Sequence, residues 1–329
     1  VILISNNTLR RSNMKKIPIV IDCDPGVDDS YAIALANSSP LFDIKAITPV
    51  EGNVPAEKTR KNALCLREML GIDCRVAFGA DRPLKKEYTT DASGTHGASG
   101  VGTVVFPDSK LPRDEKPAWD VLYEEAVKAD GELILFAVGP LTNIAITLEK
   151  HPDLPKYLKK FVIMGGGTFG NVTKSGETAE FNIWIDPTAA KQVFEKMEVW
   201  MVGLNSTHSA ALSREDFDDM IKLSGDGEKA YLVRELSKYS QVNSFDKGQD
   251  NNVIHDALAV ASVINPDVLR FEKHYVYVED GDVINNGQTV IDLEDKSGKE
   301  PNCYVGMEAD KELFAKIIKE MCAYYGSLK

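Results

Sequence analysis

The hydrophobic residues of this chain fall into short apolar runs separated by longer amphipathic segments. Short apolar runs between turn residues predict strands, and apolar spacings of three and four predict helices. The predicted strands are residues 17–22, 44–50, 75–78, 133–138, 161–164 and 198–202. The predicted helices between them are residues 29–36, 56–70, 118–129, 142–151 and 187–196. Such an alternation predicts a parallel sheet that is covered by helices on both faces.

The last third of the chain changes character. Helices are predicted at residues 214–223, 228–239, 256–265 and 310–325, and strands at 274–278, 288–293 and 303–305. Asn286-Gly287 is a turn signal, so we expect the late strands to form a hairpin region that embellishes the main fold. Residues 1–13 precede Met14 and are interpreted as a leader or an expression remnant outside the fold.

These patterns predict an α/β fold class. We expect residues 14–329 to form a single domain with a mostly parallel central sheet flanked by helices, as in open Rossmann-like proteins. In such sheets, ligands bind at the C-terminal ends of the strands. No low-complexity linker divides the chain, and no internal repeat is evident.

Composition narrows the class of partner. The net charge of −12 over 329 residues argues against nucleic acid, because phosphate binding needs clustered Lys and Arg. No apolar run approaches the ~20 residues of a membrane helix. The five cysteines are odd in number and lack CxxC spacing, which favours a reduced, cytoplasmic location over a disulfide framework or zinc site. We therefore expect a small-molecule partner, with no nucleic acid and no membrane.

An acidic cluster follows the first predicted strand. Asp22, Asp24, Asp28 and Asp29 lie within eight residues, and no Lys or Arg occurs between Lys16 and Lys45. Carboxylates this close raise one another's pKa and destabilise a fold unless a cation lies among them. Capping of the next helix would explain one or two of the four. The excess predicts a hard divalent metal with oxygen ligands.

Two other chemistries share parts of this motif. A calcium-binding EF-hand loop counted from Asp22 would need Gly and Glu where Val27 and Ile33 stand, so that interpretation fails. Haloacid-dehalogenase-type phosphatases have D-x-D-x-T/V after a first strand, and here Gly26 occupies the Thr/Val position. A Mg²⁺-dependent phosphatase with Asp22 as nucleophile therefore remains an alternative. A non-enzymatic binding or scaffold protein that keeps the site without turnover is a third.

Three further segments carry candidate chemistry. His255-Asp256 places an imidazole beside a carboxylate at the start of a predicted helix. Gly165-Gly166-Gly167 follows a predicted strand and permits a close approach of the backbone to a ligand. Glu180 and Asn182 are two residues apart, and on an extended segment both side chains would point to one side.

Together these segments resemble the nucleoside hydrolases, the family of inosine-uridine preferring nucleoside N-ribohydrolases. Asp22-Cys23-Asp24-Pro25-Gly26-Val27-Asp28-Asp29 resembles the family's DxDxGxDD signature. The resemblance continues, in the family's order, through residues 51–54, 94–97, 138–143, 164–167, 179–183 and 255–257. It covers residues 15 to 325.

The resemblance implies an enzyme with a bound Ca²⁺ ion. It implies that Asp24, Asp29, Asp256 and the backbone carbonyl of Val138 bind this ion. The implied ribose-binding residues are Asp28, Asn53, Met164, Asn171, Glu180 and Asn182. The implied reaction is the hydrolysis of purine or pyrimidine ribonucleosides to ribose and free base, which serves nucleoside catabolism and purine salvage. Members commonly form homodimers or homotetramers.

The resemblance also implies catalytic roles. Asp24 would act as general base toward a metal-bound water, and His255, with His96 as a second candidate, would assist departure of the base. Tyr239 is our candidate for an aromatic side chain that closes over the base, and Tyr231 is a core alternative. Phe169 and Phe181 are further candidates for base contacts. We assign no role to His151, His208 or His274.

Overall fold

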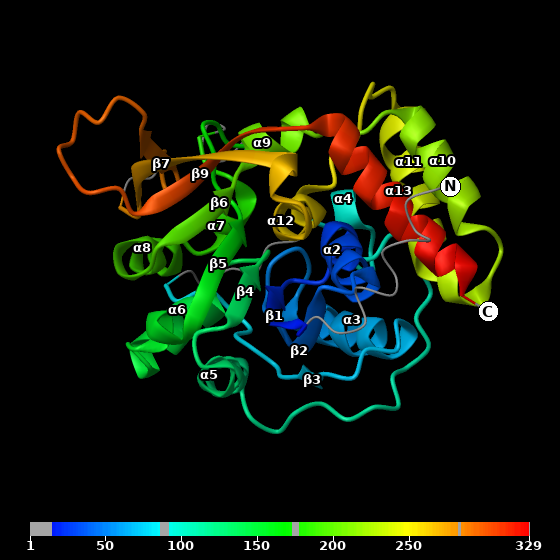
Figure 1. Cartoon of the computed structure of the whole chain (residues 1–329), viewed down its shortest axis with the longest axis horizontal. Coiled ribbons are helices and arrows are strands. Elements are labelled where there is room, and N and C mark those ends of the chain that lie inside the picture. The colour runs from blue at the N-terminus through cyan, green and yellow to red at the C-terminus, as the bar shows by residue number, and fades with distance from the viewer. Residues whose placement is uncertain (1–14, 86–91, 173–177, 282–283, 329) are drawn as a thin grey trace.

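A computed structural model describes residues 15–85, 92–172, 178–281 and 284–328, so the predicted leader lies outside the described residues. The described strands form one sheet in the order β3-β2-β1-β4-β5-β6-β9-β7-β8 (Figure 1). They are β1 (Ile17–Cys23), β2 (Phe42–Pro49), β3 (Arg75–Val76), β4 (Leu133–Ala137), β5 (Leu158–Met164), β6 (Val199–Val202), β7 (Leu269–Val278), β8 (Thr289–Asp292) and β9 (Cys303–Ala309).

The sheet is parallel from β3 to β9, and only β7 and β8 run antiparallel to their neighbours. The prediction of a mostly parallel central sheet is therefore confirmed. From β1 the chain builds outward through β2 and β3, and then returns to place β4 against the other side of β1. The carboxyl ends of β1 and β4 thus flank the point where the strand order reverses, which is where open α/β sheets bind ligands.

Successive residues of the central strands point to opposite faces of the sheet. Ile19 and Ile21 of β1 belong to one hydrophobic core, whereas Val20 belongs to the other. The first core is completed by α2 (Val27–Ser38), α3 (Ala56–Met69), α10 (Arg214–Ser224), α11 (Tyr231–Ser244), α12 (His255–Ile264) and α13 (Lys311–Ser327). The second is completed by α5 (Ala118–Ala129), α6 (Thr142–Lys150) and α8 (Pro187–Lys196). Figure 1 shows the two groups of helices on opposite sides of the sheet.

The late strands were predicted to embellish the main fold, but they extend the main sheet. β9 pairs in parallel with β6 and so extends the main sheet, and β7 pairs with β9. β7 begins at Leu269, five residues before the predicted start at 274. Residues 269–273 include Arg270, Glu272 and Lys273 and so do not form an apolar run, which is why the start of the strand was not predicted.

Three short helices were not predicted. They are α4 (Ser93–His96), α7 (Phe181–Ile185) and α9 (Leu204–Ser209). The expectation of an extended segment at Glu180–Asn182 is wrong, because Glu180 caps α7 and its side chain accepts the N–H groups of Asn182 and Ile183. The β-branched and aromatic composition of this helix is typical of a strand. Single 3-10 turns occur at η1 (Leu154–Tyr157), η3 (Glu228–Ala230), η4 (Phe245–Lys247) and η5 (Pro266–Val268).

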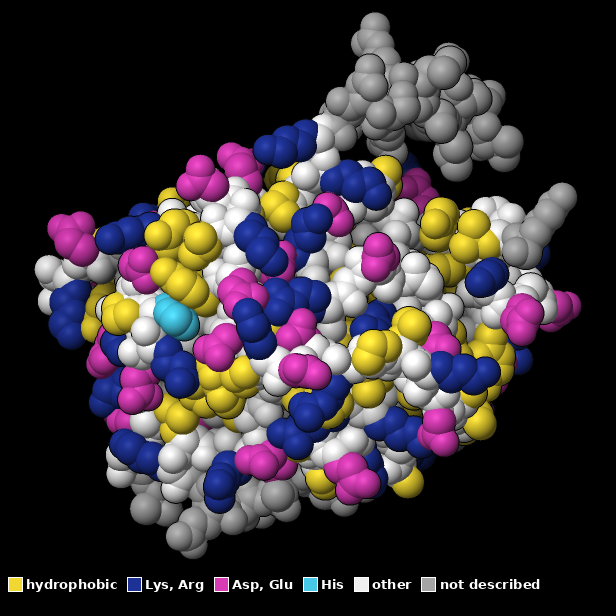
Figure 2. All heavy atoms as spheres, turned by 90° about the horizontal axis from the view of Figure 1, so that it is seen from below, with side chains coloured by type: hydrophobic (Ala, Val, Ile, Leu, Met, Phe, Trp, Pro, Cys, Tyr) yellow, Lys and Arg dark blue, Asp and Glu magenta, His cyan; other side chains and the backbone are white. Residues whose placement is uncertain are grey.

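The surface carries charged side chains of both signs (Figure 2). On the face shown in Figure 2, Lys and Arg side chains are interspersed with Asp and Glu. Among the described residues, no helix is both long enough and apolar enough to cross a membrane.

The closing helix α13 is attached to α2 by a buried hydroxyl. Tyr325 Oη donates to the Ala34 carbonyl at 3.0 Å and accepts from Asn37 Nδ2 at 3.0 Å. Its neighbour Tyr324 is 40% exposed and has no such contacts among the described residues.

Replacing Tyr325 by Phe should lower the free energy of unfolding by about 1–2 kcal/mol, because a buried hydrogen-bond pair is lost. Tyr324→Phe is the matched control and should be neutral. Urea denaturation of both variants measures the difference. Equal stabilities of Tyr325→Phe and Tyr324→Phe would contradict the attachment.

Candidate active site

The loop after β1 is folded around the carboxylate of Asp29. Its Oδ1 accepts the N–H of Asp24 at 3.0 Å, and its Oδ2 accepts the N–H of Gly26 at 2.8 Å and Nδ2 of Asn53 at 3.2 Å. Asp29 is completely buried and lies in the first turn of α2, where the positive end of the helix dipole favours a carboxylate. The sequence therefore fixes the shape of this loop locally.

Asp24 lies beneath this loop with one oxygen bonded and one free. Its Oδ2 accepts the N–H of Asn53 at 2.6 Å, whereas Oδ1 has no partner among the described residues. A Cβ atom at Gly52 would lie 2.1 Å from Oδ2, and one at Gly139 would lie 2.7 Å from Oδ1. Only glycine lets both chain segments approach so closely, and together they enclose a carboxylate oxygen that lacks a donor.

Asp28 and Asp256 complete the acidic cluster. The N–H of His255 donates to Asp28 Oδ2 at 3.4 Å, which joins residues 227 positions apart in the chain. Burial, and then the neighbouring Asp29, raise the pKa of Asp24 and Asp256 well above the usual value and that of Asp28 to about 7. The protein's own side chains therefore leave the charge of this cluster uncompensated.

The donor set fits a hard divalent cation. The clustered groups offer oxygen atoms, as Ca²⁺ or Mg²⁺ requires, and Asp24 Oδ1 is a buried acceptor without a donor. Within the described ranges, no group of three acidic, histidine or cysteine side chains is already arranged so that it could hold a metal ion. Asp29 in particular has both oxygens engaged by N–H donors.

A cavity of about 290 Å³ opens over this cluster. It is lined by Asp28, Asn53, Ala92, Thr95, His96, Val138, Met164, Asn171, Glu180, Phe181, Asn182, Leu204, His255 and Asp256. The predicted metal, ribose and catalytic residues line the cavity except Asp24 and Asp29, which are buried below it. The aromatic candidates Tyr239 and Phe169 do not line it. The structure thus brings together residues from the carboxyl ends of β1, β4 and β5 with others from α2, α7 and α12.

Asn182 connects two strand ends at the cavity wall. Its Nδ2 lies 3.0 Å from the carbonyl oxygen of Val138 and 3.1 Å from that of Met164. Glu180 accepts the N–H of Gly166 at 3.1 Å, and burial raises its pKa to about 7. A carboxylate and an amide are therefore held rigidly by the strand ends that they contact.

The two predicted histidines line the cavity in different ways. His96 Nδ1 accepts the N–H of Val27 at 3.2 Å, which leaves Nε2 as the protonated nitrogen, and burial lowers its pKa to about 4. His255 Nδ1 lies 2.8 Å from Thr207 Oγ1. Burial, followed by the neighbouring His208 and His96, lowers the pKa of His255 to about 3. Both rings are therefore neutral at physiological pH.

His208, to which the sequence analysis gave no role, lies beside this pair. Its ring centroid is 5.8 Å from that of His255 and 5.3 Å from that of Phe169. His208 is on α9, and because that helix was not predicted, no sequence signal linked it to the site. Leu204 and Thr207 were missed for the same reason.

The predicted aromatic residues differ in whether they line the cavity. Tyr239 Oη donates to the carbonyl of Thr95 at 2.9 Å, and its ring packs against Gly102, so it supports the cavity wall instead of lining the cavity. Phe181 lines the cavity. Tyr231 packs against the hydrophobic core, as the core alternative predicted.

Asp22 is separate from the cavity. It is completely buried, and its Oδ2 accepts from Thr48 Oγ1 at 2.6 Å and Asn143 Nδ2 at 2.8 Å. These bonds join β1 to Thr48 of β2 and to Asn143 of α6, so Asp22 has a structural role that does not favour a phosphorylated nucleophile. The geometry therefore does not favour the phosphatase alternative.

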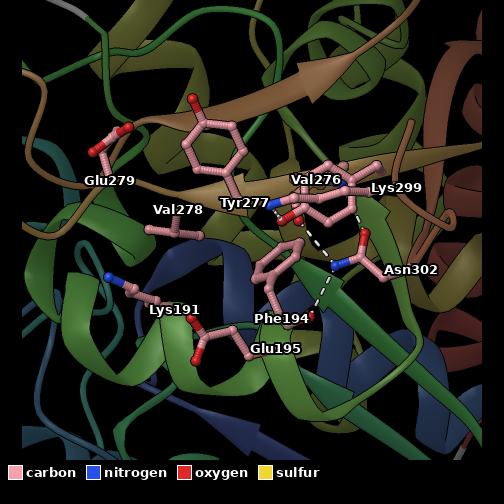
Figure 3. Close-up of a pocket in the computed structure, with 10 residues that line it drawn as sticks. Lys191, Phe194, Glu195, Val276, Tyr277, Val278, Glu279, Lys299 and Asn302 are labelled. Carbon is pink, nitrogen blue, oxygen red and sulfur yellow. Dashed lines mark hydrogen bonds between the residues drawn. The ribbon is translucent and has the colours of Figure 1, made fainter. Parts of the chain in front are cut away.

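A larger cavity of about 520 Å³ lies between α8 and β7 (Figure 3). Its two lysines have partners, since Lys191 pairs with Asp280 at 2.7 Å and Lys299 donates to Tyr275 Oη at 2.9 Å. Among its lining residues there is no buried carboxylate cluster. The smaller cavity over Asp24 is therefore the better candidate for catalysis.

Comparison with known proteins identifies the family. A model of the inosine-uridine preferring nucleoside hydrolases matches residues 19–316. A pyrimidine-specific ribonucleoside hydrolase, RihA, of Citrobacter koseri is 33% identical over 315 residues, which cover 94% of this chain and 99% of that protein. A non-specific ribonucleoside hydrolase, RihC, of Klebsiella pneumoniae is 34% identical over 310 residues, with the same coverage.

Solved structures agree with this result. A purine-preferring ribonucleoside hydrolase from Gardnerella vaginalis has a TM-score of 0.83 at 27% identity, covering 93% of this chain and 99% of that one. A plant nucleoside hydrolase has a TM-score of 0.84 at 28% identity, covering 94% and 99%. The chain belongs to the nucleoside hydrolase family and is a ribonucleoside hydrolase, an enzyme that cleaves the N-glycosidic bond. The alternative of a binding protein without turnover is therefore wrong.

The raised pKa values predict a pH dependence. Between about pH 4 and 7, the folded protein without cation binds more protons at Asp28 and Asp256 than the unfolded chain, so these groups lower stability as the pH rises. A divalent cation competes with those protons. Calcium should therefore raise the melting temperature more at pH 7.5 than at pH 5, as measured by scanning calorimetry.

Asp256→Asn is the control for this measurement and should remove most of the calcium-dependent gain. Equal gains at the two pH values, or no gain at either, would contradict the interpretation of the acidic cluster.

Proposed function

We propose that this enzyme hydrolyses purine or pyrimidine ribonucleosides to ribose and free base in the cavity over Asp24. The observation that carries the proposal is the buried Asp24 Oδ1, which has no partner among the described residues and lies below a cavity lined by carboxylate and amide groups. The named relatives include pyrimidine-specific, non-specific and purine-preferring enzymes, so the proposal extends to both classes of base.

Asp24, Asp29, Asp256 and the carbonyl oxygen of Val138 are the proposed ligands of a Ca²⁺ ion. The support is the crowding of buried carboxylates and the preference of Ca²⁺ for six to eight oxygen ligands. When bound, such an ion lowers the pKa of water and orients a sugar diol. The Val138 carbonyl already accepts from Asn182 and has a second lone pair for a cation.

Asp24 is the proposed general base. The bond from the N–H of Asn53 fixes the orientation of its carboxylate, and the free Oδ1 is available to accept a proton from an attacking water. The close approach of Gly52 and Gly139 holds the Asp24 carboxylate in this position.

Asp28, Asn53, Met164, Asn171, Glu180 and Asn182 form the proposed ribose subsite. Positive charge develops on the sugar as the glycosidic bond breaks. Carboxylate and carbonyl oxygens that are fixed before the reaction stabilise this charge without reorganising. Glu180 and Asn182, whose positions are set by backbone contacts, meet this requirement.

His255 and His96 are the proposed donors to the departing base. His96 presents Nε2–H because its Nδ1 is occupied by Val27. A hydrogen bond to a ring nitrogen of the base stabilises the negative charge that it acquires. The cytoplasmic location, the homo-oligomeric state and the part of Tyr239 in closing over the base stay predictions.

Chromatography of inosine and uridine incubated with the protein tests the function directly. We expect free base and ribose to appear, and an excess of chelator to abolish the reaction until calcium is restored. Turnover that persists undiminished in chelator would contradict the role of the cation, and absence of free base with calcium present would contradict the proposed reaction.

Asp24→Asn should reduce kcat by about 10²–10⁴-fold, because the amide cannot accept the proton. Asp43→Asn is the matched control, since Asp43 is 44% exposed and lies at the amino end of β2. Circular dichroism checks that both variants fold. Near-full activity of Asp24→Asn would exclude the proposed base.

A further inference from the structure

We propose that the hydroxyl of Thr207 is a positioning residue for His255. It would hold the imidazole by Nδ1 and so present Nε2 to the departing base. This inference rests on the proposed function, because it concerns the donor to the leaving group. Thr207 itself does not line the cavity and acts through His255.

The first support is the geometry of the contact. Thr207 Oγ1 lies 2.8 Å from His255 Nδ1, and Thr207 is 1% exposed. No described residue forms a hydrogen bond with Nε2 of His255, although His255 lines the cavity. One ring nitrogen is therefore anchored in the protein, and the other remains for a ligand.

The second support is that the hydroxyl of Thr207 can donate its proton to Nδ1 of His255. The Thr207 hydroxyl has one proton and two acceptors in reach, His255 Nδ1 and the Leu204 carbonyl at 3.2 Å. If it donates to Nδ1, a neutral ring carries its proton on Nε2. If the ring carries both protons, the hydroxyl accepts from Nδ1–H and donates to Leu204. A neutral ring with its proton on Nδ1 would instead donate to the hydroxyl and leave Nε2 as an acceptor. We assign the tautomer in which the hydroxyl donates to Nδ1 and Nε2–H faces the cavity.

The third support is the rigidity of the contact. Thr207 is on α9, which follows β6 directly, and its branched side chain restricts rotation about χ1. The ring of His208, the next residue, packs 5.8 Å from that of His255. A hydroxyl fixed in this way orients the imidazole before the substrate binds, which is the requirement for an efficient donor.

Thr207→Val tests the inference because valine keeps the shape and loses the hydroxyl. We expect kcat for inosine and uridine to fall by roughly 10–100-fold with little change in KM, because a misoriented donor weakens only the step in which the base departs. Hydrolysis of 4-nitrophenyl β-ribofuranoside should change little, since nitrophenolate departs without a donor. Thr207→Ser should recover most of the lost kcat.

Thr59→Val is the control for loss of a buried threonine hydroxyl, since among the described residues Thr59 Oγ1 bonds only the Ala56 carbonyl within α3. Its kinetics should match the wild type. An equal loss of nucleoside and nitrophenyl riboside turnover in Thr207→Val, or no loss at all, would overturn the role of Thr207. Wild-type turnover tests the proposed function separately, so failure of one does not entail failure of the other.

Discussion

Mutual repulsion among buried carboxylates is the constraint on which the site depends. Asp24, Asp29 and Asp256 are almost fully excluded from water, and burial raises their pKa values. Moving one such charge out of water costs several kcal/mol, and the neighbouring carboxylates add to that cost. The fold meets part of the cost with backbone N–H groups at Asp29, and the remainder favours a cation at the floor of the cavity.

The topology explains why these residues come together. β1 and β4 are adjacent in the sheet, and their connections leave in opposite directions, so a crevice opens at their carboxyl ends. The acidic loop follows β1, and Val138 follows β4. α12 packs against α2 and brings His255 and Asp256 to the same point. A single crevice therefore collects the groups proposed to bind the cation, the sugar and the base.

The sequence predicted the central strands well, because their apolar runs are long and bounded by clear turns. It also predicted the acidic loop, whose chemistry is local: Pro25 and Gly26 force a turn that places two aspartates in the first turn of a helix. Most of the ribose residues came from the resemblance and not from spacing. The position of the cavity that they line follows from the strand order of the sheet.

What the sequence did not predict depends on short elements and tertiary contacts. α7 and α9 are too short to show a helical period, and Glu180 is an unusual cap. Without α9, neither Thr207 nor His208 could be linked to His255. Tyr239 was assigned to the base from its place on a helix, and the contact of its hydroxyl with the Thr95 carbonyl was not evident from the sequence.

Anomalous diffraction from crystals soaked in calcium tests the central claim most directly. The account predicts one strong peak per chain, within about 2.3–2.6 Å of carboxylate oxygens of Asp24, Asp29 and Asp256. A peak elsewhere, or no peak at saturating calcium, would contradict it.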